Sequence, residues 1–363
     1  MNVQANSGQF GAIVIGAGPA GLALGHELKR RGVSFCILER GAQAGESWRL
    51  MPTQMKLVSP WKASWLPGFG ADQWSANHEV TRAEYLDYLT AYAREQGLPV
   101  RTNVSVLGIR RDQNGFLLET STGGLESRCV VSATGYFQNP LVPEIKGLEQ
   151  SEIPRFHAAD YRSADEVAEK LGKRDALILI VGKRLSAGQI LVELASAGFS
   201  VALSHRTPIQ FGSGPLGWWL FFRIHPWLES MKLALHGPKA RGFDVRMPGG
   251  RARELVEGGS IRLFPQVSRF DGEAVVFQDG RSTRPDAVLF ATGFRPVLQH
   301  LNGLGVSFDD HTGLPQVSDM ESTNVPGLFF LGLDGLRNFQ SRFIRGIRKD
   351  AGVLADRLAK RLA

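Results

Sequence analysis

The chain has 363 residues, of which 43% are hydrophobic and 21% are charged, and it carries a formal net charge of +7. This length and composition are typical of a globular protein with two domains, whose core needs no disulfide or metal cross-links. The two cysteines, Cys36 and Cys129, lie in apolar strand patterns, which excludes a disulfide framework and a C-x-x-C redox motif and predicts a reducing, cytoplasmic setting.

The first predicted element is an apolar strand at residues 12–15 that leads directly into a glycine-rich turn. The turn, Gly16-Ala17-Gly18-Pro19-Ala20-Gly21, has the spacing G-x-G-x-x-G, and a helical pattern follows at once. The first glycine of such a turn allows the tight bend, the second lets backbone approach a pyrophosphate, and the third lets the helix pack on the strand. The helix N-terminus then offers N–H groups and its positive dipole end to the phosphates. The motif predicts a dinucleotide site.

A second apolar strand, at residues 33–38, ends at Glu39. Dinucleotide-binding units place an acidic residue about 20 residues after the glycines, where it binds a ribose hydroxyl. Because strand, glycine turn, helix, strand and acid follow in the expected order, the sequence predicts a Rossmann-like fold for the first unit, with Glu39 as its ribose ligand.

The first unit closes on an apolar strand that ends in Ala133-Thr134-Gly135-Tyr136. Before it, residues 104–109 and 116–120 form a predicted hairpin with its turn at Asn114-Gly115. After it, a series of prolines indicates a linker between domains.

A second strand–turn–helix pattern begins at residue 176. The apolar residues 176–181 lead into Gly182-Lys183-Arg184-Leu185-Ser186-Ala187-Gly188, a helical pattern follows, and residues 199–203 form the next strand. This unit closes in the same way, on an apolar strand that ends in Ala291-Thr292-Gly293-Phe294. The chain therefore contains an internal repeat of a Rossmann-like unit.

Overlaying the two units places His205 where the first unit has Glu39, and Arg206 follows it. An acid at this position would repel a 2′-phosphate, so a histidine next to an arginine favours NADPH over NADH. The alternative is that Arg206 is an exposed cation at the end of a strand.

The same overlay places Arg184 where the first unit has Gly18, and Ala187 where it has Gly21. Alanine is tolerated at the third position, whereas an arginine at the second occupies the space of the close approach between backbone and phosphate. Three hypotheses follow: Arg184 turns outward or pairs with the pyrophosphate, the cofactor sits differently, or the site has lost nucleotide binding.

Two dinucleotide-binding folds, one inserted in the other and each closed by an Ala-Thr-Gly strand, resemble the two-dinucleotide-binding-domain flavoproteins. Within that group the chain is similar to the class B flavin-containing monooxygenases over nearly its whole length. The resemblance implies an α/β fold in which residues 1–150 and 286–363 form an FAD-binding domain and residues 151–285 an inserted NAD(P)H-binding domain. Of the family's interdomain signature, only the second half is present, as His157-Ala158-Ala159-Asp160-Tyr161.

The resemblance also implies which residues contact the two cofactors, FAD and NADPH. In the first domain these are Gly16, Gly18, Pro19, Ala20, Gly21, Glu39, Arg40, Trp48, Arg49, Val104, Ala133, Thr134, Gly135, Gly332, Gln340 and Ser341. In the second unit they are Gly182, Lys183, Arg184, Ser186, Ala187 and Arg206, with Thr292 and Gly293 of the second Ala-Thr-Gly motif. Gln340-Ser341 resembles the start of the helix that faces the flavin ring, and Trp48, Trp61 and Trp65 either line the flavin pocket or pack in the core. No metal site and no acid–base triad is expected, and no catalytic side chain is assigned.

The activity that the resemblance implies is monooxygenation of a small molecule. NADPH would reduce FAD, the reduced flavin and O2 would form a C4a-hydroperoxide, and a nitrogen, sulfur or carbonyl group of the substrate would receive one oxygen atom. Two alternatives stay open. One is a flavin oxidase or reductase with a degenerate nicotinamide site, which Arg184 motivates, and the other is a non-catalytic flavin-binding protein.

Few other partners are expected. No nucleic-acid-binding motif accompanies the basic residues, no secretory leader precedes the first strand, and the apolar stretch at residues 217–222 is too short to span a bilayer. That stretch is interpreted as a buried or substrate-covering helix, with a membrane-surface helix as the alternative. The sequence thus predicts a cytoplasmic protein without a nucleic-acid partner or transmembrane segment, and leaves a homodimer open.

Overall fold

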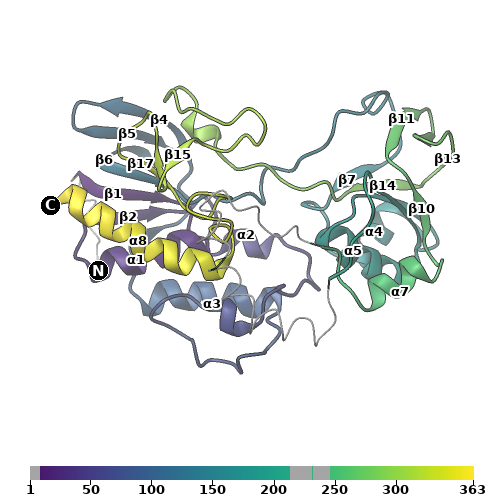
Figure 1. Ribbon diagram of the computed structural model, residues 1–363, viewed down its shortest axis with the longest axis horizontal. Coiled ribbons are helices and arrows are strands. Elements are labelled where there is room, and N and C mark those ends of the chain that lie inside the picture. The colour runs from purple at the N-terminus through teal and green to yellow at the C-terminus, as the bar shows by residue number, and fades with distance from the viewer. Residues whose placement is uncertain (1–8, 213–230, 232–245) are drawn as a thin grey trace.

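The computed structural model describes residues 9–212, 231 and 246–363, which form two lobes joined by two connecting segments (Figure 1). Each lobe is built on a sheet with a parallel centre and helices packed against it. The predicted α/β class with two Rossmann-like units is therefore confirmed. The apolar stretch at residues 217–222 lies outside the described residues. Among the described helices, none is long and apolar enough to cross a bilayer.

The first lobe holds a 9-stranded sheet. Its strands are β1 (Phe10–Ile15), β2 (Phe35–Leu38), β3 (Val100–Arg101), β4 (Val106–Asp112), β5 (Gly115–Thr120), β6 (Gly123–Ser132), β15 (Val317–Ser318), β16 (Glu321–Ser322) and β17 (Leu328–Phe330). The order is β15-β16-β17-β6-β1-β2-β3, and β4 and β5 extend from β6 as an antiparallel hairpin. Because β17, β6, β1 and β2 are mutually parallel, the turns that follow them meet at one edge of the sheet.

Helices pack together against this sheet (Figure 1). They are α1 (Pro19–Arg30), α2 (Glu46–Arg49), α3 (Arg82–Glu95) and α8 (Ile344–Leu362), with the short 3-10 turns η1 (Trp61–Ala63) and η3 (Gln299–Leu301). Proline at the first position suits the start of α1, because a helix leaves that N–H without an internal partner. Thr81 and Glu84 form a capping box that starts α3. The helix α1 packs against α8 and buries its leucines completely.

A ladder of three tyrosines on α3 was not expected from the sequence. Tyr85, Tyr88 and Tyr92 are fully buried, and each hydroxyl donates to a backbone carbonyl of residues 64–69 at 2.6 to 3.1 Å. The Tyr88 hydroxyl also accepts from the Leu66 N–H at 2.7 Å. The tyrosine ladder therefore satisfies polar backbone groups of a partly buried loop that pairs with no strand.

The second lobe holds a 5-stranded parallel sheet and a separate 3-stranded antiparallel one. The parallel sheet has the order β10-β9-β8-β14-β7, from β7 (Arg155–His157), β8 (Leu177–Val181), β9 (Ser200–Ser204), β10 (Arg262–Phe264) and β14 (Ala287–Phe290). Its helices include α4 (Ala164–Leu171), α5 (Leu185–Ser196) and α7 (Arg251–Glu257), and the smaller sheet consists of β11 (Val267–Asp271), β12 (Ala274–Phe277) and β13 (Ser282–Thr283).

The strand β14 lies in the second sheet, between β8 and β7, although the sequence predicts that residues 286–363 belong to the first domain. The outgoing and returning connections then run alongside each other, with the Leu141 N–H bonded to Gly293 and the Arg295 N–H to Asn139. The chain rejoins the first sheet only at β15. We propose that the second domain extends through Phe290.

Candidate cofactor and active site

The main cavity, of about 2430 Å3, is lined by both glycine turns and by residues of both lobes. A pocket for one small ligand measures roughly 300–1,000 Å3. The cavity therefore has room for more than one ligand, and it places whatever binds at the first turn within the same space as whatever binds at the second.

Two of the three glycines of the first turn are required by close contacts within the protein, and the third faces open space. Gly16 has a φ of +104°, and a Cβ there would lie 2.8 Å from the Ala133 carbonyl oxygen. A Cβ at Gly21 would lie 1.9 Å from the Gly16 oxygen, so close packing of the helix on the turn requires glycine. A Cβ at Gly18 would meet no protein atom within 4 Å. Since Gly18 lines the cavity at the start of α1, the open space fits a pyrophosphate that approaches the backbone.

Glu39 is held against this turn by two backbone groups. One carboxylate oxygen accepts from the Ala17 N–H at 2.9 Å and the other from the Gly41 N–H at 2.8 Å. The Glu39 backbone oxygen accepts from the Val104 N–H at 2.9 Å, and both residues line the cavity. The carboxylate is therefore fixed at the end of β2, on the wall that the first turn also forms.

Most of the predicted first-domain residues face the cavity. Those that line it are Gly16, Gly18, Pro19, Ala20, Glu39, Arg40, Trp48, Val104, Ala133, Thr134, Gly135 and Gly332. Gly21 lies beneath the turn, and Arg49 points elsewhere, because its guanidinium bonds to Glu46 at 2.6 Å with 55% of the side chain exposed.

The predicted helix start at Gln340-Ser341 is wrong, since α8 begins at Ile344. The Ser341 hydroxyl accepts from the N–H groups of Arg337 and Asn338 at 3.2 and 3.3 Å, which closes a turn before the helix. Gln340 and Ser341 are buried and do not line the cavity. The side chains that line it from this region are instead Phe339, Arg342, Phe343, Ile344, Arg345 and Ile347.

Among the three candidate tryptophans, Trp48 lines the cavity and the other two pack elsewhere. Trp61 is fully buried, with its ring 4.8 Å from that of Tyr88. Trp65 carries the guanidinium of Arg348 at 3.8 Å from its ring centre, a cation–π contact. Trp61 and Trp65 therefore stabilise the core beneath the site.

The second turn repeats a backbone hydrogen bond of the first turn. The Gly16 N–H donates to Leu38, the residue before Glu39, and the Gly182 N–H donates to Ser204, the residue before His205. Arg184 is the N-cap residue of α5, as Gly18 is of α1. The predicted correspondence of Glu39 with His205 and of Gly18 with Arg184 is therefore confirmed.

Cations dominate the wall of the cavity that the second lobe provides. The basic residues that line it are Lys183, Arg184, Arg206, Arg246 and Arg251, and Glu193 is the acid among the second-lobe lining residues. Of the other predicted residues, Gly182, Ser186, Thr292 and Gly293 line the cavity, and Ala187 is buried below it. Such a wall attracts an anionic ligand. Arg246 and Arg251 were not expected from the sequence, because no motif marks them.

Tyr136 and Asp334 form a polar pair at the first-lobe edge of the cavity. The Tyr136 hydroxyl lies 3.1 Å from the Asp334 carboxylate and accepts from the Asp334 N–H at 2.8 Å. Burial raises the pKa of Tyr136 above its ordinary range. The two residues follow β6 and β17, which pair in parallel, so the pairing of these strands brings them together.

His300 on η3 is a buried titratable group on the cavity wall. Its Nε2 lies 3.2 Å from the Ser132 hydroxyl, and burial lowers the pKa of His300 to about 4. An unfolded chain has a histidine pKa of about 6.5. As the pH falls below that value the unfolded state gains a proton that the folded state does not, so stability is lost between about pH 6.5 and pH 4.

We expect His300 to cost the protein about 2 kcal/mol of unfolding free energy when the pH is lowered from about 7.5 to about 5. His300→Gln keeps a polar group of similar length without this titration, and its loss of stability over the same interval should be smaller by that amount. Urea unfolding of both proteins at the two pH values measures the difference. Equal losses in the two proteins would show that His300 protonates in the folded state.

Residues 13–232 match the pyridine nucleotide-disulphide oxidoreductase family. The chain is 28% identical over 346 residues to the uncharacterized oxidoreductase CzcO-like of Geobacillus kaustophilus. That alignment covers 94% of this chain and 96% of the relative. It is 26% identical over 401 residues to indole-3-pyruvate monooxygenase YUCCA4 of Oryza sativa subsp. japonica, over 97% of this chain and 88% of that protein.

A solved structure agrees with the sequence matches. The flavin-containing monooxygenase from Stenotrophomonas maltophilia superposes with a TM-score of 0.80 at 25% identity, over 97% of this chain and 98% of that chain. The likeness thus includes both lobes and the connections between them.

Proposed function

The chain belongs to the pyridine nucleotide-disulphide oxidoreductase family, and from this premise we propose that it is an FAD-dependent monooxygenase that uses NADPH and O2 to oxygenate a small molecule. The resemblance to the class B flavin-containing monooxygenases, predicted from the motifs, is confirmed by the match to the Stenotrophomonas enzyme along nearly the whole chain. The observation that carries the proposal is the single cavity that contains both nucleotide-binding turns.

In this proposal the first lobe holds FAD. Gly18 and the start of α1 receive its pyrophosphate, and Glu39, fixed by two backbone N–H groups, binds a ribose hydroxyl. When bound, FAD would supply the redox chemistry, because its flavin ring accepts a hydride and reacts with O2. Trp48, Ile344 and Ile347 present apolar surface to the cavity and exclude water from it.

The second lobe holds NADPH. The N-terminus of α5 with Lys183 and Arg184 would bind the pyrophosphate, and Arg206 would bind the 2′-phosphate. The second lobe would thereby position the nicotinamide in the cavity that it shares with the first lobe. The free cysteines Cys36 and Cys129 favour a cytoplasmic location, and a homodimer stays a hypothesis.

The activity can be tested on the purified flavoprotein by following NADPH consumption, O2 uptake and H2O2 release together. Panels of amines, thioethers and ketones serve as substrates. With an accepted substrate, H2O2 release should fall below NADPH consumption, and the product should be heavier by one oxygen atom. H2O2 release equal to NADPH consumption with every compound would instead identify an oxidase.

The role of Arg184 separates the proposal from a degenerate nicotinamide site. We expect Arg184→Gly to raise the NADPH concentration needed for half-maximal flavin reduction about 10-fold or more, because a charge-assisted hydrogen bond to the pyrophosphate is lost. Anaerobic stopped-flow reduction measures this, with Arg184→Lys as the charge-preserving control. Faster reduction in the glycine variant would show that Arg184 obstructs the site and would favour the alternative.

A further inference from the structure

We propose that Arg246 is a second ligand of the 2′-phosphate of NADPH and, together with Arg206, sets the preference of the enzyme for NADPH. The inference rests on the proposed NADPH site and adds to it a residue from a distant part of the chain. Four observations carry it: the course of the backbone, the packing of the loop that bears Arg246, the engagement of the neighbouring cations, and the shared cavity.

The backbone brings Arg246 to the segment that begins at Arg206. This segment leaves β9 and runs to Gly212, where it pairs in parallel with the loop around Met247. The Met247 N–H donates to the Gln210 oxygen at 3.0 Å, and the Gly212 N–H donates to the Met247 oxygen at 2.8 Å. Arg246 therefore immediately precedes a residue that is hydrogen-bonded to the extension of β9.

Packing against α5 fixes the loop in this place. Met247 is fully buried, and a Cβ at Gly188 would lie 2.6 Å from its side chain and 2.5 Å from that of Pro248. The loop approaches the first turn of α5 this closely because residue 188 is glycine. Arg246 is consequently held near the helix N-terminus that faces the phosphates of the cofactor.

Two of the other cations of this wall already bond to protein groups. Lys183 donates to the Pro208 carbonyl at 3.0 Å, and Arg251 pairs with Glu254 at 3.2 Å. Arg246 is exposed, and no acidic side chain among residues 9–212, 231 and 246–363 forms an ion pair with it. An exposed guanidinium without a carboxylate partner is available for bidentate binding of a phosphate.

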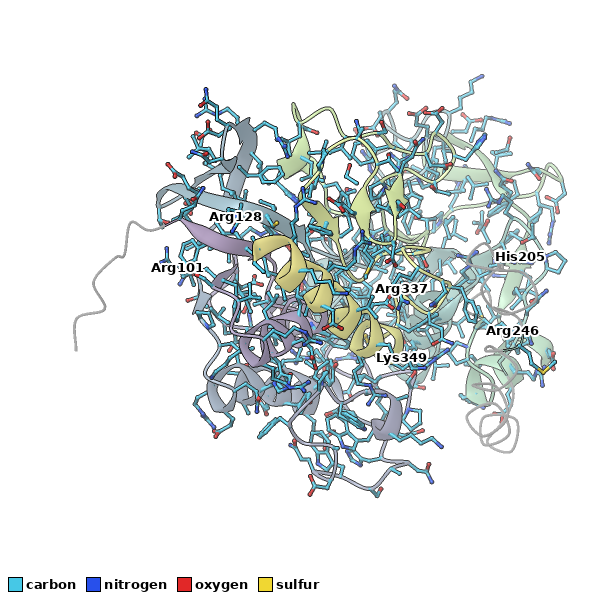
Figure 2. The ribbon with its side chains drawn as sticks, turned by 60° about the vertical axis from the view of Figure 1, so that its left-hand side comes forward. Arg101, Arg128, His205, Arg246, Arg337 and Lys349 are labelled. Carbon is cyan, nitrogen blue, oxygen red and sulfur yellow. The ribbon has the colours of Figure 1, made fainter. Side chains whose placement is uncertain are left out.

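Arg206 and Arg246 line the same cavity. The place of Arg206 in the fold indicates which group of the cofactor the two arginines would share. Figure 2 shows Arg246 and His205 at the same outer end of the second lobe, and His205 immediately precedes Arg206. His205 occupies the position of the ribose-binding acid, where a 2′-phosphate replaces the hydroxyl. Two arginines from separate segments would bind that phosphate from two sides.

Nucleotide fragments test the inference on the flavin-loaded, full-length protein without turnover. Calorimetric titration with 2′,5′-ADP reports 2′-phosphate binding, and titration with 5′-ADP reports the remainder. Arg246→Ala should weaken 2′,5′-ADP binding about 10-fold and change 5′-ADP binding less than about 2-fold. Gly188→Ala should have the same selective effect, because its methyl group displaces the loop, and Arg262→Ala, an exposed charge of β10 outside the cavity, should have none.

The double variant of Arg206 and Arg246 shows whether the two share one phosphate. Shared binding predicts losses that do not add, whereas additive losses would assign the two arginines to separate groups. Equal weakening of both fragments by Arg246→Ala, or no weakening of either, would overturn the inference and leave the NADPH site intact. If the unmutated flavoprotein binds neither fragment, the proposed NADPH site fails as well.

Discussion

Gly18→Val should yield a folded protein that has lost its flavin. Gly18 has an extended backbone that valine also adopts, and a Cβ there meets no protein atom within 4 Å. The substitution therefore strains neither the backbone nor the packing of the protein. The branched side chain would instead occupy the space in which a pyrophosphate approaches the start of α1. The absorbance of bound flavin per mole of purified protein measures the effect, which we expect to be nearly complete.

Gly21→Val is the matched control for this variant. Its Cβ would lie 1.9 Å from the Gly16 carbonyl oxygen, a backbone atom that cannot move without opening the turn. We therefore expect it to destabilise the fold by about 3 kcal/mol or more, whether or not flavin is present. If Gly18→Val retained a full complement of flavin, the first turn would not be the FAD site.

Arg206→Ala should raise the KM for NADPH by about 5- to 150-fold and leave the KM for NADH unchanged. This range corresponds to about 1–3 kcal/mol for a charge-assisted hydrogen bond to the 2′-phosphate. Arg206 lines the cavity at the end of β9 and follows His205, which takes the place of the acid of the first unit.

Initial rates with each cofactor, measured at two ionic strengths, test this expectation, because salt weakens such a contact. Arg262→Ala serves as the control for the loss of an exposed positive charge on the same lobe. Equal use of NADPH and NADH by the unmutated enzyme would contradict the role given to Arg206.

The first glycine turn was predictable because Gly16 and Gly21 satisfy local steric requirements and Gly18 leaves space for a ligand, and the spacing of the motif alone reveals all three. The overlay of Glu39 with His205 was predictable for a similar reason, since strand and helix lengths fix the distance from turn to ribose site. The tyrosine ladder had a usable signal in the spacing of Tyr85, Tyr88 and Tyr92, which places all three on one helix face.

Other features depended on contacts between distant segments. Arg246 lies at the site because Met247 forms hydrogen bonds with the extension of β9, and no local sequence pattern predicts that pairing. The start of α8 could not be located from sequence, because the Ser341 hydroxyl closes a turn there and delays the helix to Ile344. The membership of β14 in the second sheet follows from its pairing with β8 and β7, which its composition does not specify.

Anaerobic stopped-flow mixing of the FAD-loaded protein with NADPH tests the central claim most directly, because it requires both sites and the cavity between them to work together. The account predicts that the absorbance of oxidised flavin disappears with a rate that saturates with NADPH, that NADH gives the same change only at much higher concentration, and that readmitted O2 restores the oxidised spectrum. Flavin that stays oxidised at saturating NADPH would contradict the account, since the second lobe would then not deliver a hydride to the first.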